Sequence, residues 1–150
     1  MANRVSASIT LGGALTPSAY ADLAEIIASE ALSTEWDGEP FDPDHRSDGE
    51  PLRLYAHEVA GGQFDALESW CVVNGIPFVR WCGGYDAEWA PERVVFTGAG
   101  ALRSFTADEN DRILIDRQDV ERLGSIAALL AHFDAADFAV PPLIVADAAE

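Results

Sequence analysis

Few side chains in this sequence could carry nucleophilic chemistry, and the first candidates are its two cysteines, Cys71 and Cys82. Cys71 falls on the apolar face of a predicted helix, where a free cysteine behaves as a small hydrophobic residue. Cys82 comes just before Gly83-Gly84, and a catalytic thiol there would need a nearby cation or helix N-terminus to lower its pKa. Only Arg80 is close to it in the sequence, so we expect neither cysteine to be catalytic.

The three histidines, His45, His57 and His132, are spread over a predicted loop, a predicted strand and a predicted helix. A metal site needs three or four converging ligands, and the two cysteines lack the CxxC spacing of zinc modules. Glu58 follows His57, but neighbouring residues on a strand face opposite sides, so this pair does not converge for acid–base work. The sequence therefore predicts no metal site and no catalytic residue.

The motifs that bind nucleotides, build a nucleophile elbow or hold a catalytic zinc have no match in the chain. GxxxxGK[ST], GxGxxG, GxSxG and HExxH do not occur, and neither does the D-x-[DN]-x-[DN]-G-x5-E register of a calcium-binding EF-hand. We therefore expect no cofactor. Whether the protein is an enzyme stays open on these grounds.

A cluster of aromatic residues, Trp81, Tyr85 and Trp89, marks the connection between two predicted strands. Aromatic side chains in a loop can stack on a ligand or hold a protein contact. One interpretation is a small enzyme or ligand-binding domain whose pocket combines these aromatics with His57 and Cys82. The other is that Trp81 and Trp89 close one end of the core.

The acidic loop, residues 33–51, is the longest segment without apolar periodicity, and its Gly, Pro and Asp content predicts an exposed, irregular chain. Loops of this length in compact domains tend to be functional or disordered. Seven carboxylates and one arginine lie between Glu35 and Glu50, with two aromatic residues among them. We predict that the loop contacts a partner through Glu35, Trp36, Asp37, Glu39, Phe41, Asp42, Asp44, Asp48 and Glu50.

The charge balance of the whole chain is unusual, with 26 acidic against 9 basic residues and a formal net charge of −17. Such a field repels phosphate backbones, so direct binding of nucleic acid is not expected. Every basic residue is an arginine, which is typical of a GC-rich bacterial or phage genome. The acidity can serve solubility alone, or it can attract the basic surface of another protein.

In size and charge the chain is similar to small acidic proteins of phages and plasmids that block restriction or CRISPR effectors. This resemblance implies an inhibitor that occupies a basic groove built for nucleic acid and performs no chemistry itself. Acids along a rigid surface, with aromatic anchors between them, suit such a groove. We therefore predict an acidic protein-binding module, and the small enzyme or ligand-binding domain is the alternative.

Length and composition predict one soluble domain over residues 1–150. A chain of this length with 49% hydrophobic residues can bury a stable core without disulfides or metals. No apolar run approaches the roughly 20 residues of a membrane helix, and residues 1–11 lack the apolar core of a signal peptide. We expect a cytoplasmic protein that does not bind membranes.

The order of the predicted elements favours an α+β fold, a mostly antiparallel sheet with helices packed on one face. The first half alternates strands and helices, at residues 5–11, 17–32, 52–59, 64–74 and 76–82. In the second half we expect a β-meander with strands at residues 93–97, 102–107 and 112–116. Helical segments should follow at residues 120–123 and 126–133. From the apolar phase of these elements we expect ten buried positions: Leu23, Ile27, Phe64, Leu67, Cys71, Phe78, Val95, Ile113, Leu129 and Phe133.

Overall fold

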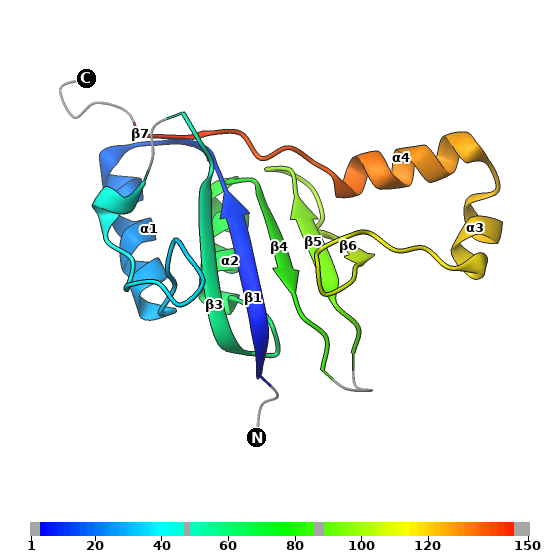
Figure 1. Cartoon of the computed structure of the whole chain (residues 1–150). Helices are drawn as coiled ribbons and strands as arrows, with labels where there is room; N and C mark the ends of the chain where they lie inside the picture. Colours follow the sequence, from blue (N-terminus) through cyan, green and yellow to red (C-terminus); the bar gives the residue numbers. More distant parts are fainter. Residues whose placement is uncertain (1–3, 47–48, 86–88, 146–150) are drawn as a thin grey trace.

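The computed structural model describes residues 4–46, 49–85 and 89–145, and its centre is a five-stranded antiparallel sheet. The strand order across this sheet is β3-β1-β4-β5-β6 (Figure 1). The strands are β1 (Arg4–Leu11), β3 (Leu52–Ala60), β4 (Phe78–Cys82), β5 (Glu92–Phe96) and β6 (Arg103–Thr106). The fold is α+β, which confirms the prediction from the order of elements.

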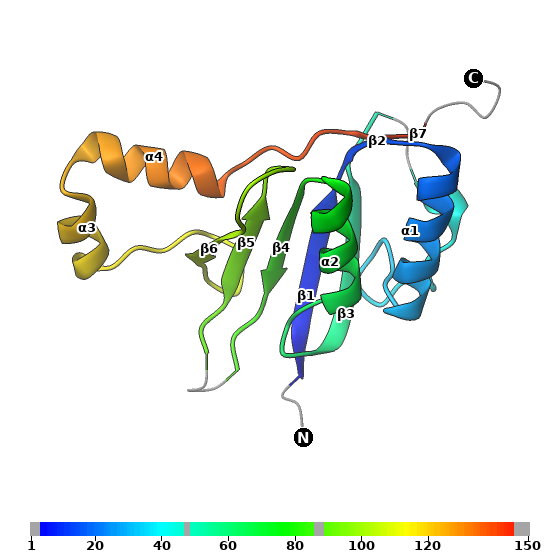
Figure 2. The ribbon, with the colours of Figure 1, turned by 180° about the vertical axis from the view of Figure 1, so that it is seen from behind.

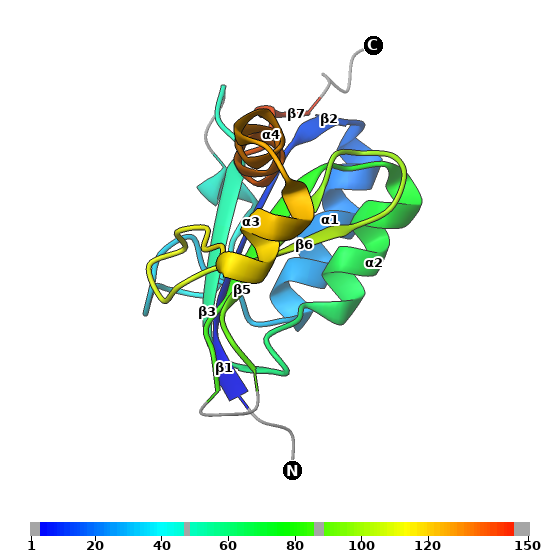
Figure 3. The ribbon, with the colours of Figure 1, turned by 90° about the vertical axis from the view of Figure 1, so that its right-hand side faces the viewer.

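Helices α1 (Pro17–Ser29) and α2 (Asp65–Asn74) cover one face of the sheet and leave β5 and β6 uncovered on that side (Figures 2 and 3). Helix α1 begins where the sequence predicts, because Thr16 accepts a hydrogen bond from the Ala19 amide in the first turn. Helix α2 ends at Gly75, whose φ of 67° lies in the left-handed region. The main core lies between these helices and the sheet and includes Leu23, Ile27, Leu67, Cys71 and Phe78.

Helices α3 (Arg117–Leu123) and α4 (Ile126–Ala136) form an arm that extends beyond strand β6 (Figure 1). The arm meets the face of the sheet opposite α1 and α2 through the C-terminal part of α4. There Ala136 joins a small cluster of buried residues, and the His132 ring lies edge-on to the ring of Phe105 on β6, with 5.1 Å between centroids. Most of the arm therefore lies outside both cores.

The C-terminal segment returns to the start of the chain through a strand pair that the sequence did not predict. Strand β2 (Gly13–Leu15) pairs in parallel with β7 (Leu143–Val145), so the segment after α4 runs along the upper edge of the sheet in Figure 1. Gly12 lies against this segment. A Cβ atom at Gly12 would come within 1.7 Å of the Pro141 carbonyl oxygen, so this approach requires a glycine.

Seven of the ten predicted core residues are buried, and the exceptions are Ile113, Leu129 and Phe133, which are partly exposed. All three follow β6. The strand predicted at residues 112–116 is reduced to one bridge between Ala107 and Ile113. The physical reason is that the chain leaves the sheet here for the arm, so its alternating apolar residues have no neighbouring strand to pair with.

Candidate functional site

The acidic loop follows a defined path because residues within it are tied to the rest of the protein. Ser33 and Tyr55 exchange two backbone hydrogen bonds, which holds the start of the loop against the edge of β3. Phe41 is only 8% exposed and joins the main core, and its amide donates to the Leu32 carbonyl. This burial corrects the expectation that Phe41 is offered to a partner. Its side chain anchors the loop instead.

The second half of the loop is ordered by a short 3-10 turn, η1 (Pro43–His45). Asp42 caps this turn by accepting a hydrogen bond from the Asp44 amide, and the His45 side chain accepts one from the Asp42 amide. Tyr20 of α1 donates a hydrogen bond to the Pro43 carbonyl. The described part of the loop is otherwise irregular, as its composition predicted.

Six carboxylates of the loop are exposed. They are Glu35, Asp37, Glu39, Asp42, Asp44 and Glu50. Asp48, the remaining one of the seven carboxylates predicted to contact a partner, lies outside the described residues. Arg46 is the loop's one cation, and its guanidinium lies 5.5 Å from the centroid of the Tyr20 ring. The loop therefore presents a strongly negative surface, which the buried side chain of Phe41 and the backbone hydrogen bonds of Ser33 hold in shape.

Trp36 is the exposed aromatic residue of the loop, with 41% of its surface open. Its ring lies over β3, with its centroid 4.9 Å from those of Tyr55 and His57. These two residues project from the side of the sheet that α1 and α2 do not cover, since the alternate positions on β3 are buried in the main core. Trp36 thus combines a fixed position with an accessible ring, as an interface anchor requires.

A chain of polar contacts joins the acidic loop to the sheet beneath Trp36. Ser6 Oγ on β1 lies 2.9 Å from His57 Nδ1, and His57 Nε2 lies 3.2 Å from a carboxylate oxygen of Asp37. A β-bulge brings the first two together, because Ser6 stands opposite both His57 and Glu58 where the register shifts. The extra residue, Glu58, has a φ of 57°, and Asp37 has a φ of 59°. Both values are costly for residues other than glycine.

The order serine, histidine, carboxylate is the one that activates a hydroxyl nucleophile, with the histidine as base and the carboxylate fixing its tautomer. The site is open: the side chains of His57 and Asp37 are 45% and 83% exposed. Sequence reasoning did not bring these three residues together, since they lie far apart in the chain. The contacts arise because β3 has a bulge opposite Ser6 and because the acidic loop passes over β3. Neither feature has a local sequence signal.

The predicted aromatic pocket is divided in the structure. Tyr85 lines a hollow of about 550 Å³ together with Ser6 and His57. Trp89 stacks on Tyr85, with 5.4 Å between ring centroids. Trp81 is 8% exposed and donates its indole N–H to the Asp108 carbonyl, on a different part of the same face. Tyr85 and His57 therefore share a site, whereas Trp81 is structural.

Both cysteines are unsuited to nucleophilic chemistry. Cys71 is fully buried, and this burial raises the pKa of its thiol to about 12. Cys82 is 1% exposed, and burial raises its pKa as well, although the neighbouring Arg80 opposes the shift. The enzyme interpretation of the sequence therefore loses Cys82 and keeps His57.

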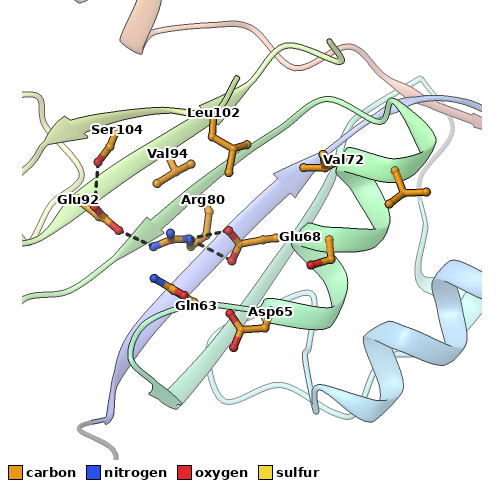
Figure 4. A pocket seen from close by; sticks show the side chains of 11 residues that line it. Gln63, Asp65, Glu68, Val72, Arg80, Glu92, Val94, Leu102 and Ser104 are labelled. Atoms are coloured by element: carbon orange, nitrogen blue, oxygen red, sulfur yellow. Dashed lines mark hydrogen bonds and ion pairs between the residues drawn. The ribbon is translucent and has the colours of Figure 1, made fainter. Parts of the chain in front are cut away.

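A buried polar cluster that sequence analysis did not single out lies on the helix side of the sheet (Figure 4). Arg80 is 3% exposed and donates hydrogen bonds to Glu68 of α2, Glu92 of β5 and the Gly62 carbonyl. Burial raises the pKa of Glu68, with Arg80 acting in the opposite direction. A hollow of about 560 Å³ adjoins the cluster, and its apolar wall includes Val72, Val94 and Leu102.

The partners of Arg80 give this cluster a structural role, because they connect α2 to β4 and β5. The sequence does contain a signal for it. Arg80 stands between Phe78 and Cys82 on the alternate positions of β4 that face the core, and a buried arginine requires acidic partners.

Among the described residues, no group of three or more His, Cys, Asp or Glu side chains is placed to hold a metal ion. Within the same part of the chain, no helix has both the length and the apolar character needed to cross a membrane. Comparison of the chain with protein-family models, curated proteins and solved structures gave no match.

Proposed function

We propose that this protein binds the basic surface of another protein through its acidic loop, with Trp36 as the central apolar contact. One observation carries the proposal: six exposed carboxylates share a loop with an exposed tryptophan, and the buried side chain of Phe41 holds that loop in place. A loop fixed before binding loses little conformational entropy in the complex, which favours affinity.

The charge of the chain supports the same proposal. A net charge of −17 destabilises a compact protein by self-repulsion, and the loop concentrates that repulsion. A basic partner would relieve it and would be drawn to the loop by electrostatic attraction. The complementary surface is the basic groove of a nucleic-acid-processing complex, so the protein would act in the cytoplasm as an inhibitor of the anti-restriction or anti-CRISPR kind. It would contact neither nucleic acid nor membrane directly.

Capture of partners from a bacterial host lysate at low salt tests this proposal. The loop variant carries three substitutions in exposed acids: Glu39→Gln, Asp42→Asn and Asp44→Asn. Asparagine caps a turn as well as aspartate does, so η1 should be kept. The control variant removes the same charge from exposed acids elsewhere: Asp22→Asn, Glu25→Gln and Glu121→Gln. We expect the wild type and the control to capture a basic protein that the loop variant does not. Equal capture by all three proteins would contradict the proposal.

The contacts of Ser6, His57 and Asp37 favour a second candidate function, hydrolysis of an acyl ester. In this reaction Ser6 Oγ attacks the ester carbonyl while His57 takes its proton and passes it to the departing alcohol. Water, deprotonated by the same imidazole, then attacks the acyl-serine and releases the acid and free Ser6. Arg4 lines the same hollow and would stabilise the negative charge on the carbonyl oxygen.

A fluorophosphonate probe, which labels activated serines, separates this candidate from the binding function. If the protein hydrolyses esters, the probe should label Ser6, as located by mass spectrometry, and this label should be lost in His57→Gln. Ser8→Ala is the matched control, because Ser8 projects from β1 on the same side of the sheet and lies outside this hollow. An unlabelled wild type, or labelling that persists in Ser6→Ala, would refute the hydrolase hypothesis. Neither result would affect the proposal that the acidic loop binds a basic partner.

A further inference from the structure

Helix α4 is apolar on nearly all sides, yet it is poorly covered. Its eleven residues include one acid, Asp134, and no arginine or lysine, and Ala136 is its one buried residue. Ile126 and Leu130 are 75% and 58% exposed. A helix that is hydrophobic all round normally lies inside a protein. In a chain with 23% charged residues, this exposure is unusual.

The exposed side of α4 is a continuous stripe at helical spacing. It consists of Ile126, Ala127, Leu130 and Ala131, all of them exposed. The stripe lies on the arm, beyond the edge of the sheet (Figure 1), while Ala136 and His132 contact the sheet. Two alanines on such a stripe allow a second helix to approach closely.

We propose that the stripe is covered by a second copy of this chain, with the two α4 helices antiparallel about a two-fold axis near Leu130. An apolar stripe of this kind is complementary to itself, and two-fold dimers are the commonest oligomers. In this arrangement Leu130 meets its counterpart, and Ala127 and Ala131 face apolar residues of the other helix.

The charges next to the stripe fit this arrangement. An antiparallel pair centred on Leu130 places Asp134 of one copy beside Ile126 of the other. Ile126 is the first residue of α4, where Ser125 caps the helix and the helix dipole is positive. Arg122 precedes that end, with a side chain that is 62% exposed and forms an ion pair with Asp119 of α3. The one charged residue of α4 thus faces the positive end of the partner's helix dipole, twice in a symmetric dimer.

A second copy is favoured over the basic partner proposed above because the arm is less acidic than the acidic loop. Helices α3 and α4 carry two arginines against three acids, whereas the segment from Glu35 to Glu50 carries one against seven. Two chains of charge −17 repel each other less where weakly charged surfaces meet than where their acidic loops meet. An association through the arms satisfies that condition and leaves both acidic loops free.

Sedimentation equilibrium at micromolar concentrations tests the dimer, with Leu130→Glu as the disrupting variant and Val73→Glu as the control. Val73 on α2 is 83% exposed and lies outside the arm, so its variant adds the same charge elsewhere. We expect wild type and Val73→Glu to be dimers and Leu130→Glu to dissociate at least about 100-fold more readily, since it buries two facing carboxylates. A monomeric wild type, or a Leu130→Glu dimer of unchanged stability, would overturn the proposal.

Crosslinking checks the geometry separately from stability. Both native cysteines are buried, so Leu130→Cys would add an accessible thiol. Oxidation should join two chains through this residue, because the axis places both copies of it side by side. The matched variant Val73→Cys should stay uncrosslinked under the same conditions. Equal crosslinking of the two variants would contradict the antiparallel arrangement, whatever the outcome of partner capture by the acidic loop.

Discussion

The acidic loop and the α3–α4 arm contrast in composition and in packing. The loop is rich in polar residues, yet it reaches the main core through Phe41. The arm is rich in apolar residues, yet Ala136 is the one fully buried residue of its two helices. Anchoring lets the loop display charge in a fixed shape, whereas the arm displays apolar surface. The two regions are therefore suited to partners of opposite chemistry.

The largest effect that would test this contrast is on stability. Phe41→Ala should lower the free energy of unfolding by about 3–5 kcal/mol, because it opens a cavity in the core beneath the loop. Ile126→Ala on the arm should change it by less than about 0.5 kcal/mol in dilute, monomeric protein. Urea denaturation of both variants measures the difference. Similar values for the two would mean that the loop and the arm do not differ in packing.

The next effect concerns Trp36 as the apolar contact between the acidic loop and its partner. Trp36→Ala should speed dissociation from a captured basic partner roughly 30-fold while leaving the association rate nearly unchanged, because it removes a desolvated contact without altering charge. Surface plasmon resonance measures both rates. A variant with wild-type dissociation would show that the acids act without an aromatic anchor.

Salt should act in opposite directions on the two regions. Higher ionic strength should weaken partner binding by the loop, since the attraction is screened, and should strengthen self-association, since the repulsion between acidic chains is screened. We expect changes of roughly tenfold in each dissociation constant. Titrations at low and high salt, followed by sedimentation for the dimer, measure both. If salt weakened or strengthened both partner binding and self-association, the same kind of surface would make both contacts.

The smallest effect is on the pH dependence of stability. It concerns the buried cluster around Arg80, which belongs to neither the loop nor the arm. Burial raises the pKa of Glu68 in the folded protein, so the folded state holds this proton more tightly than the unfolded state does. Its contribution to stability is therefore present at acidic pH and is lost as the pH rises through the raised pKa. Glu68→Gln should remove this dependence. Urea denaturation across the acidic range measures the free energy of unfolding of both proteins. The same pH dependence in the wild type and in Glu68→Gln would contradict a raised pKa of Glu68.

Local sequence signals predicted the parts of the fold that local chemistry determines. Thr16 and Gly75 marked helix ends correctly because a cap and a left-handed residue act within one turn. The apolar period also placed Phe64 and Phe78 in the core. Helix α4 shows the limit, since its period indicated burial of Leu129 and Phe133, whereas the sheet ends before it can cover them.

The candidate site was predictable in part. Composition predicted an exposed loop, and Trp36 and six of the loop's carboxylates are exposed. Phe41 could not be assigned to the core from sequence, because a single aromatic residue in a polar loop has no period. The contacts of His57 with Ser6 and Asp37 depend on a β-bulge and a loop crossing, which are set by pairing between distant segments.

The association rate of the captured partner is the most direct test of binding through the acidic loop. The loop variant with Glu39, Asp42 and Asp44 neutralised should associate more slowly than the wild type, and its rate should depend less steeply on salt. The control variant, with the same charge removed from α1 and α3, should keep the wild-type rate and salt slope. Equal slowing in the two variants would show that net charge attracts the partner without the loop, and this result would contradict the proposed function.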